Sequence, residues 1–354
     1  SFLYNYGLHE KIPGPDGFAG LPYPLNETRQ GRQRSNVYRG TYTKVITPTI
    51  INYAYGGVNF WKERNRALTY GQNWSAKGIC LRDAWNCDVN FPRIQFSDYS
   101  TWGPEALDGS ENFVFSFGND LSITRGAHTF KMGYLWERTH YNGFGQQTIA
   151  GLVRGDRRST SVPNDNNLST GGGNGFASFL LGEAYSGGTE NERFVGQQWR
   201  SHAFYFQDDW KVTRRLTLNL GLRYEFTLPP LEQKDKWSDF TPDRPNPRAD
   251  NIPGALRFAG FGPGRENSRT LVDGWWGGWG PRLGLAYSLN DRTVIRAAGA
   301  RTFGIVKTTT GSTHFDGAVL IYRPESLDNG ITPAFKMDDG LPPYQKPPVI
   351  DPSF

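Results

Sequence analysis

One stretch of the sequence, LTLNLGLRYEF over residues 216–226, alternates apolar and polar side chains without a break. A period of two over this length predicts a β-strand with one apolar face and one polar face. At ~3.3 Å per residue the strand is roughly 36 Å long, about twice the usual strand of a soluble sheet. Tilted by ~40°, it rises about 27 Å, which is close to the apolar thickness of a membrane. The stretch therefore predicts lipid on one side of a sheet and water on the other.

The composition agrees with a membrane surface rather than with one compact core. Among 354 residues, 14% are aromatic, and so many rings are expected at a surface that accepts them, such as a membrane interface. The mean hydropathy is −0.59, and no run of eighteen apolar residues occurs. This excludes membrane-spanning helices but not barrel strands, because alternation hides such strands from hydropathy.

The charges and cysteines exclude some functions and leave others open. The net charge of +5 is scattered along the sequence without a clustered basic stripe, so we expect no nucleic-acid partner. Cys80 and Cys87 lie close together in a polar segment. In an exported protein they could close a small disulfide loop, whereas in the cytosol they would be free thiols.

Alternating segments recur in pairs around tight turns, which predicts hairpins near 36–61, 112–138, 198–228 and 281–303. Long stretches rich in Gly, Pro, Asn and Trp separate the hairpins and are expected to be loops, as is the segment 1–34. Short turns that alternate with long loops are typical of bacterial outer-membrane barrels. The sequence therefore predicts an all-β chain that contributes about eight to ten strands to an antiparallel transmembrane barrel. Eight of these strands form the four hairpins, the two further ones would be Ala255–Ala259 and Ala318–Tyr322, and Phe176–Gly182 is expected to form a short helix or strand.

The alternation also assigns side chains to the two faces of the predicted wall. Polar residues such as Asp120, Lys131, Arg223 and Glu225 would line a water-filled lumen. The residues expected to face lipid are Phe113, Phe115, Phe117, Leu121, Leu216, Leu218, Leu220, Leu222 and Tyr224.

No pattern in the sequence indicates catalysis, a cofactor or a metal site, so we expect a protein that is not an enzyme. Glu137 and His140 have the spacing of a helical metal site, but on a strand they would face opposite sides. Asn164–Asn167 and Asp208–Asp209 lack the spacing of a calcium loop. His128 lies beside a tight turn and is expected to be exposed there.

Three loop tryptophans, Trp275, Trp276 and Trp279, leave two interpretations open. Exposed rings among glycines could stack on a sugar or peptide ligand. Alternatively, they could pack the loops onto one another or onto the rim of the barrel.

Several segments together resemble a known family. They are NETRQGRQRSNVYRGTYTKVITPTIIN, TRGAHTFKMGYLWERTHYNGFG, GFASFLLG, FYFQDDWKVTRRLTLNLGLRYE, NIPGALRFAGFGPGR and WGPRLGLAYSLNDRTVIRAAGARTFG. In this order they are similar to TonB-dependent outer-membrane receptors, and more narrowly to the Oar-like branch of that superfamily. The resemblance covers most of residues 25–304.

The resemblance implies a barrel of about 22 strands in the bacterial outer membrane, plugged by an N-terminal domain. It also implies energy coupling through the TonB complex and import or recognition of a substrate that the sequence does not name. No plug, TonB box or N-terminal sandwich domain is recognisable in residues 1–354, so we expect one partial barrel domain. The alternatives are a small self-contained outer-membrane barrel with a structural or adhesion role, and a secreted carbohydrate-binding β-protein.

Overall fold

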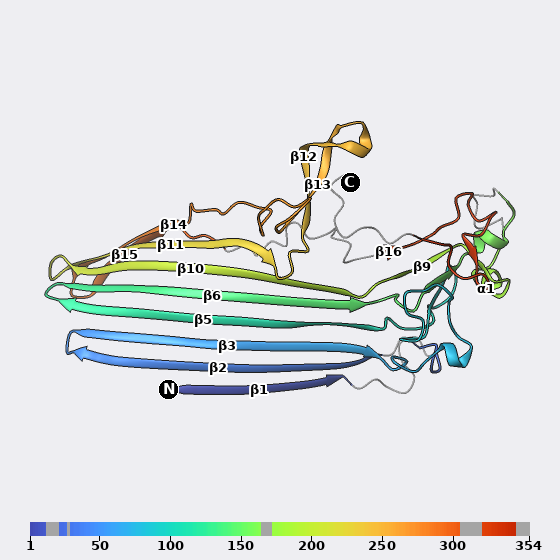
Figure 1. Cartoon of the computed structure of the whole chain (residues 1–354). Coiled ribbons are helices and arrows are strands. Elements are labelled where there is room, and N and C mark those ends of the chain that lie inside the picture. Colours follow the sequence, from blue (N-terminus) through green and yellow to red (C-terminus); the bar gives the residue numbers. More distant parts are fainter. Residues whose placement is uncertain (12–20, 27–28, 164–171, 305–320, 345–354) are drawn as a thin grey trace.

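The computed structural model describes residues 1–11, 21–26, 29–163, 172–304 and 321–344. Its main element is one antiparallel sheet of nine strands, which we call the wall (Figure 1). In chain order and in sheet order, these strands are β1 (Phe2–Lys11), β2 (Arg29–Thr47), β3 (Ile50–Ala67), β5 (Leu107–Arg125), β6 (His128–Gln146), β10 (Arg193–Lys211), β11 (Leu216–Glu232), β14 (Trp279–Asn290) and β15 (Thr293–Ala300). The expectation of an all-β antiparallel fold is confirmed.

The pairing register keeps the two side-chain faces separate along the strands, between register shifts near the strand ends at Val45/Thr47, Gln198/Arg200 and Ser288/Asn290. Residues directly opposite each other in an antiparallel pair share a face. Leu222 of β11 lies opposite Phe206 of β10 and Pro281 of β14, and the next polar residue, Arg223, lies opposite Tyr205 and Gly280. Because side chains repeat with a period of two, a slip of one residue would reverse both faces. The alternation that predicts each strand therefore also fixes how the strands align.

The two ends of the wall differ. At one end the strands are joined by short turns at residues 48–49, 126–127, 212–215 and 291–292. At the other end they are joined by long connections at residues 68–106, 147–192 and 233–278. In Figure 1 the short turns lie on the left and most of the loop structure lies on the right. All four hairpins lie where the alternation puts them, and three of them extend well beyond the expected bounds.

The N-terminal segment is a correction to the sequence analysis. Residues 1–34 were expected to be loop, but β1 spans Phe2–Lys11 and pairs with β2, which already begins at Arg29. Two further strands were predicted outside the four hairpins, at Ala255–Ala259 and Ala318–Tyr322, and neither joins the wall in the described residues. Ile252–Phe258 forms β13, which pairs only with β12 (Ser238–Asn246), and Ile321–Tyr322 forms β16 in a separate sheet. Residues 318–320 lie outside the described residues.

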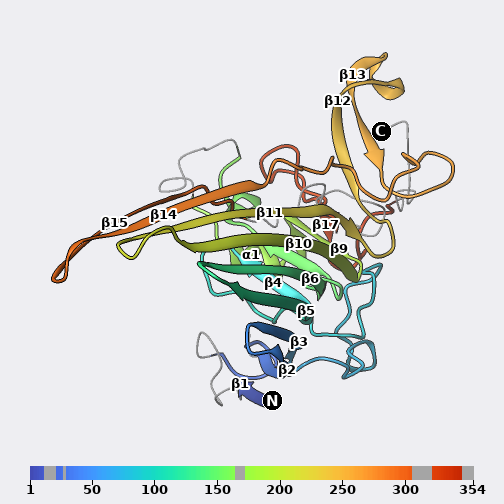
Figure 2. The same cartoon turned by 90° about the vertical axis from the view of Figure 1, so that its left-hand side faces the viewer.

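The wall is curved and open. Figure 2, which looks at the turn end, shows the sheet as an arc with β1 and β15 at its two ends. Within the described residues these two edge strands do not pair with each other. The structure is therefore part of a barrel rather than a closed one.

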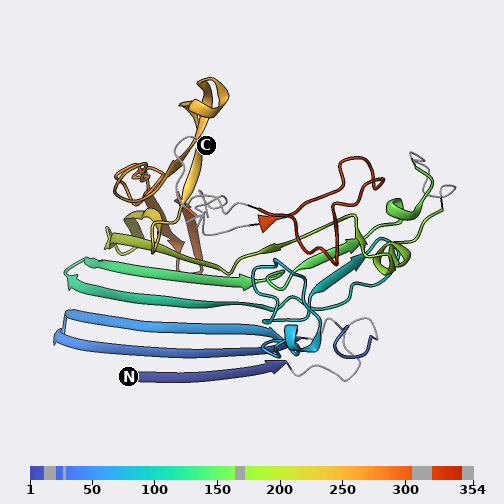
Figure 3. The same cartoon turned by 45° about the vertical axis from the view of Figure 1, so that its right-hand side comes forward.

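The long connections are folded structure rather than extended loops, and we call residues 68–106, 147–163, 172–192 and 321–344 the loop layer (Figure 3). One small sheet joins β16, β9 (Ser186–Glu190), β7 (Leu152–Gly155) and β4 (Arg93–Phe96), and another joins β17 (Phe335–Lys336) to β8 (Glu183–Ala184). The segment 176–182 is mostly helical, within α1 (Gly175–Leu180). Short 3-10 helices are η2 (Ser75–Lys77) and η3 (Arg157–Thr160) in this layer and η4 (Pro247–Ala249) between β12 and β13.

The loop layer has apolar cores of its own. Trp74, Phe91, Ile94 and Phe96 form one buried cluster against α1, and Leu81, Val153, Ala184, Phe335 and Leu341 form a second. Burial of one such side chain stabilises by roughly 1.5–3 kcal/mol, so each cluster can hold distant parts of the chain together. None of the helices in the described part of the chain is long and apolar enough to cross a membrane.

Candidate functional site

The polar face of the wall carries an organised network of aromatic and charged side chains. The Tyr205 hydroxyl donates a hydrogen bond to Asp120 Oδ1 at 2.9 Å, across the intervening strand β6. The ring passes over Gly133 of β6, where a Cβ atom would overlap both the ring and the Asp120 carboxylate. Tyr55 crosses Gly118 of β5 in the same way. Glycine is needed at both positions because the neighbouring tyrosine occupies the space of a side chain.

A second part of this network is centred on Asp209. Its carboxylate accepts hydrogen bonds from Lys131 Nζ at 2.9 Å, Gln207 Nε2 at 2.8 Å and Asn219 Nδ2 at 2.6 Å. Arg223 Nε donates to Glu225 Oε2 at 2.8 Å on the same face. The four residues predicted to line a lumen thus all lie on the polar face, each with a polar partner. These partners make this face a hydrophilic surface.

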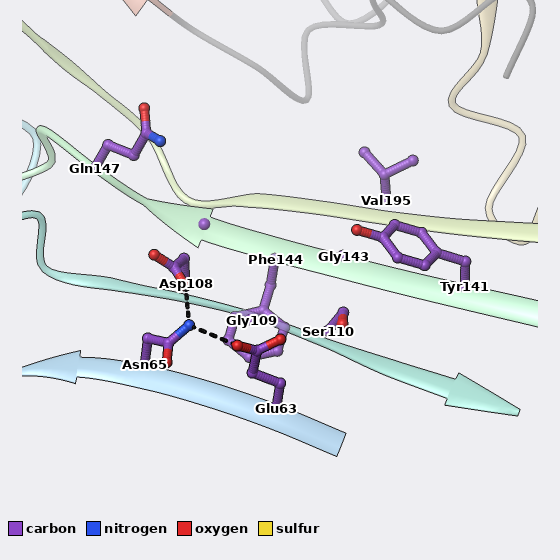
Figure 4. Close-up of a pocket in the computed structure, with 11 residues that line it drawn as sticks. Glu63, Asn65, Asp108, Gly109, Ser110, Tyr141, Gly143, Phe144, Gln147 and Val195 are labelled. Atoms are coloured by element: carbon purple, nitrogen blue, oxygen red, sulfur yellow. Dashed lines mark hydrogen bonds between the residues drawn. The ribbon is translucent and has the colours of Figure 1, made fainter. Parts of the chain in front are cut away.

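At the loop end of the polar face, residues of β3, β5, β6 and β10 and the residue that follows β6 line an open pocket of about 470 Å³ (Figure 4). The side chain of Asn65 of β3 bridges the two carboxylates that line this pocket. Its Nδ2 donates to Glu63 Oε1 at 3.1 Å and to Asp108 Oδ1 at 2.7 Å. Figure 4 shows this bridge, with Ser110 and Tyr141 on the same side of the sheet. The lining residues also include Gln147 and Val195. The arrangement offers acceptor oxygens and the aromatic residues Tyr141 and Phe144 to a polar ligand.

Arginines anchor the carboxylates beside this pocket. Arg29 of β2 pairs with Asp108 and, at 3.0 Å, with Glu105 Oε2, and Arg93 of β4 reaches Glu105 Oε1 at 3.0 Å. Asp108 is therefore held from two sides, by an amide and by a guanidinium. Glu63, which is bonded only to Asn65 among these groups, is the carboxylate best placed to meet a ligand.

Two buried carboxylates fix the connections that rise from the rim. Glu190 is 2% exposed and accepts from the backbone N–H of Gln147 and of Thr148, the latter at 3.0 Å. Glu232 is fully buried and accepts from the backbone N–H of Gly196, Lys234 and Lys236 at 2.7–2.9 Å. Such bonds to a charged acceptor are stronger than those between neutral groups. In the connection 68–106, a disulfide joins Cys80 to Cys87 with a Cα–Cα distance of 5.3 Å.

The opposite face of the wall is apolar over its middle, and no element in the described part of the chain packs on most of it. Phe115, Phe117, Leu220 and Leu222 are 37–48% exposed, and the other predicted lipid-facing residues, Phe113, Leu121, Leu216, Leu218 and Tyr224, are half-buried. The register adds neighbours of the same kind to this face, namely Phe204, Phe206, Leu283 and Leu285, which are 36–57% exposed.

The three tryptophans also lie at the loop end, but two of them belong to the apolar face. Trp279 stacks on Tyr224 with ring centroids 4.1 Å apart, and Trp276 packs on Phe226 at 4.9 Å. Trp275 packs on Phe303 at 5.2 Å. Each ring thus has an aromatic neighbour, and 52–56% of each tryptophan is exposed.

Several polar residues have neighbours that the sequence did not predict. His128 Nδ1 lies 2.7 Å from Asp208 Oδ2, and its ring stacks between Phe130 and Trp210 at the turn end of the apolar face. A single strand pattern cannot reveal this pair, because it depends on the register between β6 and β10. Glu137 and His140 lie opposite Ser201 and Phe113 respectively, on different faces of the wall, as the alternation predicts. Of Asn164–Asn167, all four lie outside the described residues.

Comparisons with known proteins identify the fold. Residues 2–353 match the family described as outer membrane beta barrel domain. The ferric-catecholate import receptor Fiu of E. coli K12, in its open form, is similar with a TM-score of 0.41 and 12% identity over 85% of this chain and 44% of Fiu. P. aeruginosa FpvA bound to a heterologous pyoverdine gives 0.30 and 11% over 76% of this chain and 37% of FpvA. The chain thus spans less than half of either receptor. No curated protein matches it.

Proposed function

Because the chain belongs to the outer membrane beta barrel domain family and is located in the bacterial outer membrane, we propose that it forms part of the barrel of an Oar-like TonB-dependent receptor. The observation that carries the proposal is the combination of two separated faces with two different ends. An apolar and a polar face lie on opposite sides of the wall, while short turns close one end and folded connections close the other. This is the layout of barrels whose turns lie in the periplasm and whose loops lie outside the cell.

Each surface then has a separate task. The apolar face meets lipid, and Trp276 and Trp279 form part of the aromatic girdle at the outer interface. The polar face lines an aqueous lumen. The loop layer and the pocket around Glu63 receive a substrate from outside, and the acceptor oxygens of the pocket favour a polar substrate that carries hydrogen-bond donors. A plug domain and the TonB complex would supply closure and energy.

The two alternative folds, a secreted soluble protein and a small self-contained barrel, predict different environments for the same strands. A secreted soluble protein would bury Leu216, Leu220 and Phe115 in its own core, but Leu220 and Phe115 are 37% and 38% exposed. A self-contained small barrel would pair its two edge strands, which the described residues do not. If the protein acts in adhesion, the same loops carry the function, but they bind a surface instead of an imported substrate.

Depletion of nutrients from the medium tests the import role. Strains that lack this protein, or lack a functional TonB complex, would be compared with the parent on a panel of scarce polar nutrients by mass spectrometry. Import predicts that both deletions abolish uptake of the same compound. The variant Glu63→Gln should weaken that uptake, whereas Asp291→Asn, in a turn at the far end of the wall, should not. Unchanged uptake in the deletion strain, with loss of surface attachment, would instead support adhesion.

A further inference from the structure

Strand pairing gathers basic residues that are dispersed in the sequence. In β3 the residues on the apolar face run Val58, Phe60, Lys62, Arg64 and Arg66, so the face changes from apolar to basic towards the loop end. On the neighbouring strand β2, Arg34 lies directly opposite Lys62, and Arg32 directly opposite Arg64. Five cations therefore share one patch, which we call the basic strip. The linear sequence shows no such cluster because about thirty residues separate its two halves.

The charges within the strip are not balanced. Among the described residues, Glu10 and Glu111 are the carboxylates that pair with it. Glu10 Oε1 lies 3.0 Å from Arg32 Nε, and Glu111 is shared between Lys62 and Arg64, the latter at 3.4 Å. Like charges directly opposite on neighbouring strands are unfavourable, so a bound anion would relieve this arrangement. The side chains of Arg32 and Arg64 are 52% and 59% exposed and available to such an anion.

The strip also borders a concave site. Arg32, Arg64 and Arg66 line an open pocket of about 540 Å³, whose lining also includes Lys11, the Arg32 partner Glu10, Gln30, Tyr70 and Leu107. Aromatic rings support two of the guanidinium groups. Arg64 lies over Phe144 and Arg66 over Tyr70, each at 5.8 Å from the ring centroid. Guanidinium groups bind phosphate through two parallel hydrogen bonds, and ring contacts reduce the freedom that they lose on binding.

The position of the pocket limits what can reach it. It opens on the apolar face of the wall, just beyond Phe60 and Phe113, whose rings lie 4.7 Å apart. With that face in lipid and the loops outside, as proposed above, this is the level of the headgroups in the outer leaflet. From these observations we infer that the basic strip binds the phosphate groups of an outer-leaflet glycolipid, of the lipid A type. Tyr70 and Leu107 would contact its sugar and proximal acyl carbons.

The test uses the intact protein, purified from outer membranes in detergent and titrated with bisphosphorylated lipid A in mixed micelles. A cationic side chain near an anionic lipid surface contributes about five-fold in affinity, so R32Q/R64Q/R66Q should weaken binding on the order of 100-fold. The matched control is R39Q/R282Q/R296Q, which removes the same charge from exposed arginines on the polar face of the wall. The control should bind lipid A like the unaltered protein.

Two further arms use the unaltered protein and do not depend on the folding of a variant. Dephosphorylated lipid A should bind as weakly as bisphosphorylated lipid A binds to the triple variant. Inorganic phosphate at the same concentration should not displace the lipid. Equal losses in the triple variant and its control, or equal binding of both lipids, would overturn the inference. Displacement by inorganic phosphate would show a phosphate-ion site rather than a lipid site.

Discussion

The loop layer contains two buried apolar cores of its own, whereas the apolar side chains of the wall form a row that stands exposed on one face. Trp74, Phe91 and Ile94 are 2–7% exposed, but Phe117 and Leu222 of the wall are 48% and 43% exposed. Single apolar side chains of the loop layer, such as Leu180 and Leu327, are exposed, but its cores are buried without a nonaqueous neighbour. By contrast, the row of exposed leucines and phenylalanines on the wall requires a nonaqueous neighbour. The contrast indicates that the two regions are built for different solvents, and the following predictions test that difference.

The largest effect is expected from a charge on the apolar face of the wall. Leu220→Arg should destabilise the membrane-inserted form by ~2–4 kcal/mol if the residue lies near the bilayer midplane. Gly221→Arg is the matched control at the same depth on the polar face, where a new Cβ would lie at an ordinary 3.5 Å from Arg282 Cβ. Urea unfolding of the intact protein in lipid vesicles measures both. Equal losses in the two variants would contradict the assignment of the faces.

In the loop layer, replacing both cysteines should act locally. Loss of the Cys80–Cys87 disulfide should cost about 2 kcal/mol, because the unfolded connection gains freedom that the cross-link removes. Limited proteolysis of C80S/C87S should then cut within residues 68–106 faster than in the unaltered protein. The wall should unfold in urea at the same midpoint as in the unaltered protein. A lower midpoint would show that the loop disulfide also supports the wall.

Packing on the polar face predicts a smaller loss. Gly133→Ala should destabilise the wall by ~1–2 kcal/mol, because the new methyl group displaces the Tyr205 ring from its hydrogen bond with Asp120. Gly40→Ala, in a part of the same sheet where a Cβ has no neighbour within 4 Å, serves as the control. Adding Tyr205→Ala to Gly133→Ala removes the overlap, so the double variant should lose less than the sum of the single variants.

The smallest effect concerns acid. Asp88 in the loop layer accepts a hydrogen bond from the backbone N–H of Ser75 at 2.9 Å, and hydrogen bonding by Ser75 lowers the pKa of this carboxyl. A lowered pKa in the folded state means that the stabilisation is present above the ordinary pKa of aspartate and is lost as the pH falls through the folded value. The protection factor of the Ser75 amide, which corrects for the intrinsic pH dependence of exchange, should fall over that range. Asp88→Asn should remove the pH dependence, and an unchanged profile would contradict the predicted role.

The sequence predicts the wall well because each strand carries its own signal. The alternation in residues 216–226 is complete within one strand, and it also specifies which side chains share a face. The missed strand β1 carries the same signal, with Phe2, Tyr4, Tyr6 and Leu8 on alternate positions. The Pro- and Gly-rich residues that follow it favoured a loop for the whole segment.

The candidate sites could not be predicted in the same way. Glu63, Asp108 and Tyr141 come from three strands, and the pocket exists only once their register is known. The basic strip depends on the register of β2 and β3. In the loop layer, strands such as Glu183–Ala184 are too short to show a period, and their partners lie far away in the sequence. A site that is formed by several strands cannot be predicted from the residue pattern of one strand alone.

Collision of nitroxide spin labels with oxygen and with a water-soluble nickel complex is the most direct measurement of the contrast between wall and loop layer. Labels would be placed one at a time at residues 216–226 of the intact protein in lipid vesicles, where the disulfide keeps Cys80 and Cys87 from reacting. Leu216, Leu218, Leu220 and Leu222 should be accessible to oxygen, and Thr217, Asn219, Gly221 and Arg223 to the nickel complex. The two accessibilities should alternate out of phase with a period of two. Low accessibility to both reagents at the leucines would place them in a protein core and contradict the membrane wall.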